Sequence, residues 1–253
     1  MKNRVAFTLP QLLVTVAVGS LLTVAILPVL QSDHETLQRA ICASNLREIG
    51  QAITLYANDN NDCFPPGYER SAATDWHLII GPYLAKSQTT YASGGTRSPV
   101  FICPAAVLVP PSGTTISLTY SAHRWMFPDL PSTCSPPPSL PCVYHLGQCT
   151  RPSEVVMVTD GCQQSVASTT TFDALACLDG VADCTIAYSS APPNKRNLPE
   201  PMDPAKNVDG PNGIGLIRWR HYNNNGANFL MVDGHVQSFL GGQLLRRNLY
   251  YDQ

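Results

Sequence analysis

Four side chains near the C-terminus have types and spacing that could support hydrolytic chemistry: His221, Asp233, His235 and Ser238. A hydrolase would use one of the two histidines as general base, Asp233 to orient it and Ser238 as nucleophile. No nucleophile-elbow or zincin motif surrounds these positions. Alternatively, a metal ion could be bound by His221, Asp233 and His235. Neither their spacing in the sequence nor the number of ligands shows whether such a site exists.

Asp233 and Gly234 also have a simpler structural explanation. They stand between two strand-length segments, Ala227 to Val232 and His235 to Leu240. An Asp-Gly dipeptide in this setting predicts a hairpin closed by a type I′ turn. An aspartate in a turn needs no catalytic purpose. We therefore interpret His221, Asp233, Gly234 and His235 as a structural or weakly functional cluster, with no catalytic residue, metal or cofactor expected.

The nine cysteines contain no C-x-x-C pair, which argues against a zinc ribbon or a thioredoxin-like motif. Six of them lie between Cys134 and Cys184, where periodic apolar segments are few. A loop-rich stretch gains most from covalent cross-links. The sequence therefore predicts disulfide bonds and an oxidising compartment. It does not determine the pairing, and the odd number leaves at least one cysteine outside any intrachain pair.

The N-terminal region contains 24 consecutive uncharged residues, from Phe7 to Leu30, preceded by Lys2 and Arg4. A helix of this length, at a rise of about 1.5 Å per residue, spans a hydrocarbon core of about 30 Å. We expect a transmembrane helix at 7–30, with the basic N-terminal end in the cytoplasm. A secretory signal peptide is the alternative, but its apolar core is shorter and no A-x-A site follows here.

Residues 31–57 predict an amphipathic helix that continues the membrane helix and lays one face on a globular head. The apolar positions recur in steps of three and four, at Leu37, Ile41, Cys42, Leu46, Ile49, Ile53 and Tyr56. The polar cluster from Asn58 to Asp62 predicts the end of this helix.

The remaining residues, 58–253, are expected to form the head. Glu154 to Thr159 is a short apolar run before Asp160-Gly161, which predicts a buried strand followed by a turn. Turn signals dominate at about 110–151 and 162–211, which predicts loop-rich, cysteine-rich insertions. The expected fold class is α+β, with the long N-terminal helix packed on a small antiparallel sheet.

Charge excludes one class of partner. The formal net charge is -2, charged residues make up 13% of the chain, and there is no long basic run. A nucleic-acid-binding protein needs a basic patch or stripe to meet the phosphates. We therefore expect no nucleic-acid partner.

The first residues carry a family resemblance. A short basic leader, a small residue and the run from Phe7 to Val14 resemble the processing site of type IV prepilins and type II secretion pseudopilins. The resemblance implies that residues 1–6 are a leader, that prepilin peptidase cuts between Ala6 and Phe7, and that the new amine of Phe7 is methylated. It also assigns an assembly role to the position of Gln11, where family members usually carry Glu. A neutral Gln11 cannot form their ion pair, which leaves a low-copy role open.

Parts of the head resemble the same proteins. Cys42 to Gly50 and Val100 to Pro104 are similar to head segments of prepilin-type proteins. The passage from Arg220 to Val236 resembles their H-X9-DG segment, although eleven residues separate His221 from Asp233 here. The resemblance implies a pilin-like head, with the extra two residues placed in the turn at Tyr222 to Gly226.

Together these features predict a non-enzymatic pilin-like or pseudopilin-like subunit, or an accessory, of a type II secretion or type IV pilus-like envelope apparatus. It would cross the cell inner membrane once, with the N-terminus cytoplasmic and the head periplasmic or extracellular. The expected partners are the membrane, prepilin peptidase, and other pilin-like subunits or the secretion apparatus. One alternative is a permanently membrane-tethered extracytoplasmic binding protein. An envelope hydrolase or metal-binding protein is the third hypothesis.

Overall fold

The computed structural model describes most of the chain outside several loops. Its described residues are 9–69, 74–84, 89–90, 96–106, 119–130, 144–162, 171–172, 189, 191, 193–200, 202, 204–205, 207–209 and 217–250. For residues 21–33 it describes the course of the helix only. The predicted insertions at 110–151 and 162–211 therefore fall largely outside the described residues.

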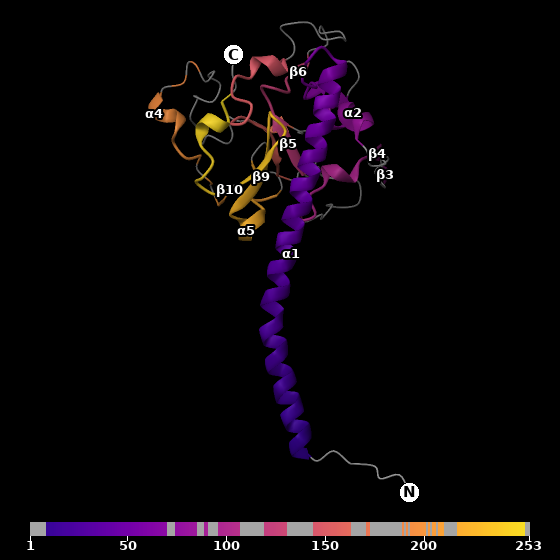
Figure 1. Cartoon of the computed structure of the whole chain (residues 1–253), viewed down its shortest axis with the longest axis vertical. Coiled ribbons are helices and arrows are strands. Elements are labelled where there is room, and N and C mark those ends of the chain that lie inside the picture. The colour runs from indigo at the N-terminus through magenta and orange to yellow at the C-terminus, as the bar shows by residue number, and fades with distance from the viewer. Residues whose placement is uncertain are drawn as a thin grey trace.

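A single helix, α1 (Leu9–Asp59, 51 residues), joins the two helical segments that the sequence predicted separately. At about 1.5 Å per residue it is about 75 Å long. Its N-terminal half extends away from the head, and its C-terminal half runs along the head (Figure 1). Asn61 and Asp62, both with positive φ, follow the helix and end it where the polar cluster predicted.

Among the described residues, no helix has an apolar stretch of the length needed to cross a membrane. Of the membrane segment expected at 7–30, residues 7 and 8 lie outside the described residues. The side chains of residues 21–30 lie outside them as well.

The head is built on a sheet in the order β10-β9-β7-β5-β8. Four strands are antiparallel: β10 (Val236–Leu240), β9 (Gly226–Met231), β7 (Val156–Asp160) and β5 (Tyr120–His123). The short edge strand β8 (Thr171–Phe172) pairs with β5 in parallel. The α+β class is therefore confirmed, with residues 34–59 of α1 packed on a four-stranded antiparallel sheet.

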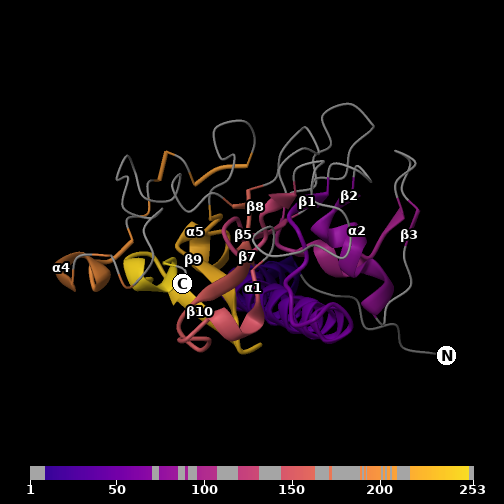
Figure 2. The same ribbon diagram turned by 90° about the horizontal axis from the view of Figure 1, so that it is seen from above.

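Small elements complete the head on both sides of this sheet, as the view from above shows (Figure 2). A second sheet has the order β2-β1-β6 and a two-stranded one pairs β3 with β4. The remaining elements are β1 (Tyr68–Glu69), β2 (Thr74–Asp75), α2 (Trp76–Ile80), η1 (Gly81–Tyr83), β3 (Thr89–Thr90), β4 (Thr96–Arg97), η2 (Pro99–Phe101), β6 (Asp129–Leu130), η4 (Leu146–Gln148), α4 (Pro193–Arg196), α5 (His221–Asn224) and η8 (Arg246–Asn248).

The sheet lies between two apolar layers because successive side chains of a strand face opposite sides. On β9, Leu230 belongs to the core shared with α1, whereas Phe229 and Met231 belong to a second cluster with Trp219. The helix approaches β9 closely at Gly50, where a Cβ atom would lie 3.0 Å from Leu230 Cδ1. Glycine at this position therefore allows the helix to rest directly on the strand.

The predicted buried face of the amphipathic helix is confirmed for most of its length. Cys42, Leu46 and Ile49 are fully buried, and Ile53 and Tyr56 continue the same face. Leu37 and Ile41 were expected there too, and this is wrong, because they are 59% and 41% exposed. Both precede Cys42, which is the first fully buried residue of α1 among the side chains that the structure describes.

The hairpin is confirmed, but its predicted turn type is wrong. Gly234 has φ +89°, whereas Asp233 is not among the residues with positive φ. Gly234 N donates to Met231 O and Met231 N donates to His235 O, both at 2.9 Å. This is a three-residue loop with its glycine in the left-handed region, a common alternative to the type I′ turn. The longer loop spares Asp233 a positive φ.

Strand β7 matches the predicted buried run, but β5 was not predicted. Its four residues, Tyr120 to His123, lie inside the stretch interpreted as a loop insertion, yet all are buried, and the strand lies between β7 and the edge strand β8. A strand buried on both faces lacks the alternation that marks a half-exposed strand. The neighbouring proline and serine residues therefore dominated the sequence pattern.

Candidate functional site

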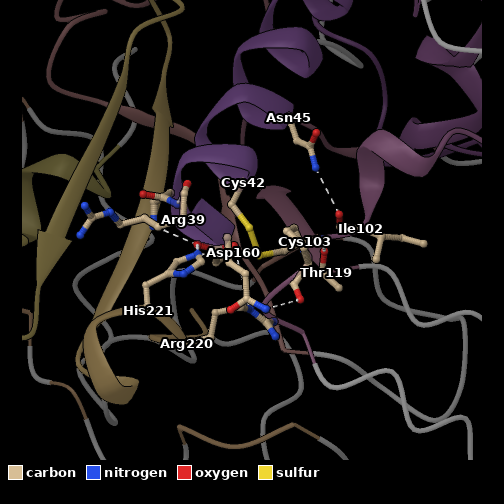
Figure 3. The surroundings of a disulfide bond; sticks show 12 residues. Arg39, Cys42, Asn45, Ile102, Cys103, Thr119, Asp160, Arg220 and His221 are labelled. Atoms are coloured by element: carbon tan, nitrogen blue, oxygen red, sulfur yellow. Dashed lines mark hydrogen bonds and ion pairs between the residues drawn. A yellow bond between two sulfur atoms is a disulfide. The ribbon is translucent and has the colours of Figure 1, made fainter. Parts of the chain in front are cut away.

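A cluster of buried polar side chains meets where α1 crosses the sheet (Figure 3). Cys42 on α1 forms a disulfide with Cys103, which follows η2, 61 residues later. Asp160 ends β7, and His221 begins α5 just before β9. All four residues are fully buried. We call Cys42, Cys103, Asp160 and His221 the disulfide cluster.

The backbone around Cys103 is held from two sides. Cys103 N donates to Thr119 Oγ1 at 2.6 Å. Asn45, one turn beyond Cys42 on α1, donates from Nδ2 to Ile102 O at 3.2 Å. These bonds position the segment after η2 against the helix, so the two sulfur atoms are presented to each other by ordered elements.

Asp160 is the charged centre of the cluster. Its Oδ2 accepts a hydrogen bond from Asn228 N at 2.9 Å and lies 3.3 Å from His221 Nε2. Its Oδ1 lies 4.0 Å from Arg220 Nε, and the Arg220 side chain is only 2% exposed. The guanidinium also lies 3.6 Å from Asp209 Oδ1 and donates to Gly161 O. A buried carboxylate and a buried guanidinium thus compensate each other.

Two ionisable groups near the disulfide cluster have raised pKa values because they are buried. Burial raises the pKa of the Tyr120 hydroxyl well above its usual range, and the negative charge of Asp160 raises it further. Burial also raises the pKa of the Cys162 thiol to about 12, with Asp209 adding to the effect. Both groups therefore stay protonated at neutral pH.

His221 is held by the turn that follows it. Tyr222, Asn223 and Asn224 have left-handed φ values of 52°, 56° and 62°. Asn225 N donates back to His221 O at 3.0 Å. The turn also contacts α1, because Asn223 N donates to Glu35 Oε1 at 3.0 Å and the Arg39 guanidinium lies 4.3 Å from the centroid of the Tyr222 ring. This is the turn expected to contain the two extra residues.

The other predicted residues lie at the opposite end of β9. Asp233 and His235 flank Gly234 in the hairpin turn, about 20 Å along the strand from His221 at the usual rise per residue. Asp233 Oδ1 accepts from His235 N at 3.1 Å and lies 2.6 Å from His235 Nδ1. The predicted group of His221, Asp233 and His235 therefore does not converge on one point.

Ser238, the residue considered as a nucleophile, is hydrogen-bonded within the hairpin. Ser238 donates its hydroxyl to Asn228 Oδ1 at 2.6 Å, across the strand pair. Asp233 and Gly234 help to line an open groove beside α1, together with Arg47, Gly50, Gln51, Thr54 and Leu55. Of the processing residues, Ala6 and Phe7 lie outside the described residues, and Gln11 is exposed on α1.

The sequence did not identify Asp160, Cys103 or Arg220 as partners of His221. The available signals were an aspartate at the end of a mostly apolar run and an Arg-His pair shortly before another predicted strand. What brings them together is strand pairing and the path of α1, because Asp160 ends β7 and His221 lies shortly before β9, the neighbouring strand of the sheet. Arranged in this way, the cluster can lock α1 to the head and present sulfur, nitrogen and oxygen ligands to one point.

Known proteins offer no further guide. No family model, no curated protein and no solved structure matches this chain.

Proposed function

We propose that the chain is a non-enzymatic pilin-like or pseudopilin-like subunit, or an accessory, of a type II secretion or type IV pilus-like envelope apparatus. The observation that carries this proposal is the form of α1. One continuous helix of 51 residues has exposed side chains at residues 9–20 and one face buried against an antiparallel sheet at residues 42–57. A subunit anchored by its N-terminus and displaying a head needs this arrangement.

The N-terminal part of α1 suits a membrane. Leu9, Leu12 and Leu13 are 74%, 57% and 63% exposed, and Val14 and Val16 are exposed beside them. Water-exposed apolar side chains in such a row indicate burial in another apolar phase. The uncharged run from Phe7 to Leu30 is long enough for a bilayer. We therefore propose a single-pass inner-membrane protein with a periplasmic or extracellular head.

The disulfide supports the location of the head. The bond between Cys42 and Cys103 joins α1 to the segment after η2. Structural disulfides persist in oxidising compartments and are rare in the cytosol. The basic residues before the apolar run favour a cytoplasmic N-terminus, which places the rest of the chain across the membrane.

The processing step is tested by the N-terminal residue of the mature protein. The full chain is produced with and without prepilin peptidase, and the N-terminal peptide is identified by mass spectrometry of membrane fractions. We expect a start at methylated Phe7 only when the peptidase is present. An Ala6→Val variant is the control, since a bulky residue before the cut should leave the chain uncleaved.

Two results would contradict this assignment. An intact Met1 in both preparations would favour a permanently membrane-tethered binding protein. A new N-terminus beyond Leu30 would indicate a secreted protein instead. Because Gln11 cannot provide the carboxylate used in family assembly, a processed chain is expected at low copy number among other pilin-like subunits.

A further inference from the structure

We propose that the disulfide cluster is a closed Zn²⁺ site when Cys42 and Cys103 are thiols, so that zinc and the disulfide are alternative occupants of the same four side chains. The ligand atoms of Cys42, Cys103, Asp160 and His221 all lie within 4.8 Å of one another. This inference goes beyond the proposed envelope function and does not depend on it.

The spacing of the ligand atoms suits tetrahedral zinc. Zn–S bonds of about 2.3 Å and Zn–N and Zn–O bonds of about 2.0 to 2.2 Å place ligand atoms about 3.3 to 3.8 Å apart. His221 Nε2 lies 3.3 Å from Asp160 Oδ2 and 3.7 Å from Cys103 Sγ. Two of the ligand-to-ligand distances therefore already match those of a zinc tetrahedron. Opening the disulfide would move the two sulfur atoms apart, toward the distance expected between two zinc-bound sulfurs.

The four ligands are supplied by ordered segments. Cys42 lies on α1, Asp160 ends β7, and His221 is held by the turn at its C-terminal side (Figure 3). Asp160 Oδ2 is oriented by the hydrogen bond from Asn228 N at 2.9 Å, the kind of outer contact that fixes a metal-binding carboxylate. Asp160 Oδ1 has no hydrogen-bond partner among the described residues although it is buried.

Charge also balances in the zinc-bound state. Two thiolates and the Asp160 carboxylate carry three negative charges, which Zn²⁺ and the neighbouring guanidinium of Arg220 neutralise. In the disulfide state the carboxylate and guanidinium neutralise each other. The same buried region therefore accepts either state without an uncompensated charge, which would be costly there.

The donor set selects the metal. Two sulfurs, one imidazole and one carboxylate match Zn²⁺, whereas Ca²⁺ and Mg²⁺ prefer oxygen ligands only. All four ligand residues are fully buried, so no open position is available for water. The site is accordingly structural and would stabilise the junction of α1 with the sheet before oxidation.

The two states differ by a balanced redox step. Forming the disulfide breaks two S–H bonds, forms one S–S bond and transfers two electrons and two protons to an oxidant such as a partner protein's disulfide, which becomes a dithiol. Zinc binding breaks the same two S–H bonds and releases two protons without electron transfer. Zinc and the partner disulfide therefore compete for one dithiol.

The test supplies metal while the chain folds, because the site is closed afterwards. The full chain is synthesised without cells, in detergent micelles, anaerobically and with a phosphine reductant that adds no thiolate, in the presence of Co²⁺ as a spectroscopic substitute for Zn²⁺. We expect one equivalent of bound Co²⁺ with the absorption of tetrahedral thiolate ligation. The chain with Cys42→Ser and Cys103→Ser should lose this equivalent, and His221→Ala should weaken binding at least about tenfold.

A matched control separates this site from other thiols. Cys63 Sγ lies 3.4 Å from His145 Nδ1, a second cysteine-histidine contact outside the cluster. Cys63→Ser should keep both the stoichiometry and the spectrum. The proposal is overturned if the reduced wild-type chain shows no thiolate-to-cobalt absorption, or if the Cys42→Ser, Cys103→Ser chain binds Co²⁺ with an unchanged spectrum.

Discussion

Two aspartate-histidine pairs lie at the two ends of β9, and they differ mainly in their surroundings. Asp160 and His221 are 3.3 Å apart with side chains 0% exposed, whereas Asp233 and His235 are 2.6 Å apart with side chains 34% and 42% exposed. The exposed pair has the shorter contact. Water screens it, however, and exposed ion pairs contribute little to stability. The distance between two charged groups is therefore a poor guide to how much their contact contributes to stability.

The buried pair has a different role because its neighbours depend on it. Arg220 has a side chain that is 2% exposed and faces Asp160, and the disulfide lies against His221. A buried charge that loses its partner retains the cost of dehydration. The residues that stand out most as a sequence motif, around Asp233 and Gly234, form a turn, whereas Asp160 is the aspartate on which the buried side chains depend.

The largest expected difference between the two ends is in thiol reactivity. Cys162, two residues after Asp160, has a pKa raised by burial to about 12, so at pH 8 only about one part in ten thousand is thiolate. An ordinary thiol is about one quarter thiolate at this pH. We expect native Cys162 to react with iodoacetamide about a thousandfold more slowly than a cysteine placed at the exposed turn by His235→Cys.

This reactivity is measured by mass spectrometry of the individual peptides after timed alkylation. Because the raised pKa stabilises the protonated thiol, raising the pH toward 12 should increase the rate at Cys162 steadily. Denaturant should abolish the difference between the two sites. Equal rates in the native chain at pH 8 would show that the region around Asp160 is open to solvent.

The second expected difference is in stability. Asp160→Asn removes the negative charge beside Arg220 and should lower the free energy of unfolding by about 3 kcal/mol, the scale for breaking a buried ion pair. Asp233→Asn is the matched change at the exposed pair and should cost about 0.5 kcal/mol or less. Denaturant unfolding of the full chain in detergent measures both values.

The remaining Asp209 carboxylate, 3.6 Å from Arg220 Nη2, limits the cost of Asp160→Asn. It is 23% exposed and cannot replace a fully buried partner. If the two asparagine variants proved equally stable, the distinction drawn between the two ends of β9 would be incorrect.

The sequence correctly predicted those elements that are determined by a few neighbouring residues. The run ending at Thr159 became β7, and the apolar steps from Cys42 to Tyr56 became the buried face of α1. The hairpin was found for the same reason. Its turn type was missed because Asp-Gly is compatible with both two-residue and three-residue loops, and hydrogen bonding decides between them.

The features that could not be predicted depend on contacts between residues far apart in the sequence. The disulfide joins residues 61 positions apart, and His221 approaches Cys103 across 118 positions. Nothing in the spacing of nine cysteines selects this pair, because the choice depends on where α1 meets the sheet. Strand β5 was missed for a related reason, since its burial comes from neighbours on β7 and β8.

The smallest expected effect tests whether the exposed end is only a turn. Gly234 has φ +89° and open space where a Cβ atom would lie, so Gly234→Ala changes backbone strain without a clash. We expect it to lower the free energy of unfolding by about 1 kcal/mol. Gly147→Ala is the control, because Gly147 also has open space and lacks a positive φ. It should be neutral or stabilise by about 0.5 kcal/mol. Equal costs for the two alanine variants would mean that the conformation of Gly234 is not what requires glycine, and the hairpin turn would then need an explanation from function.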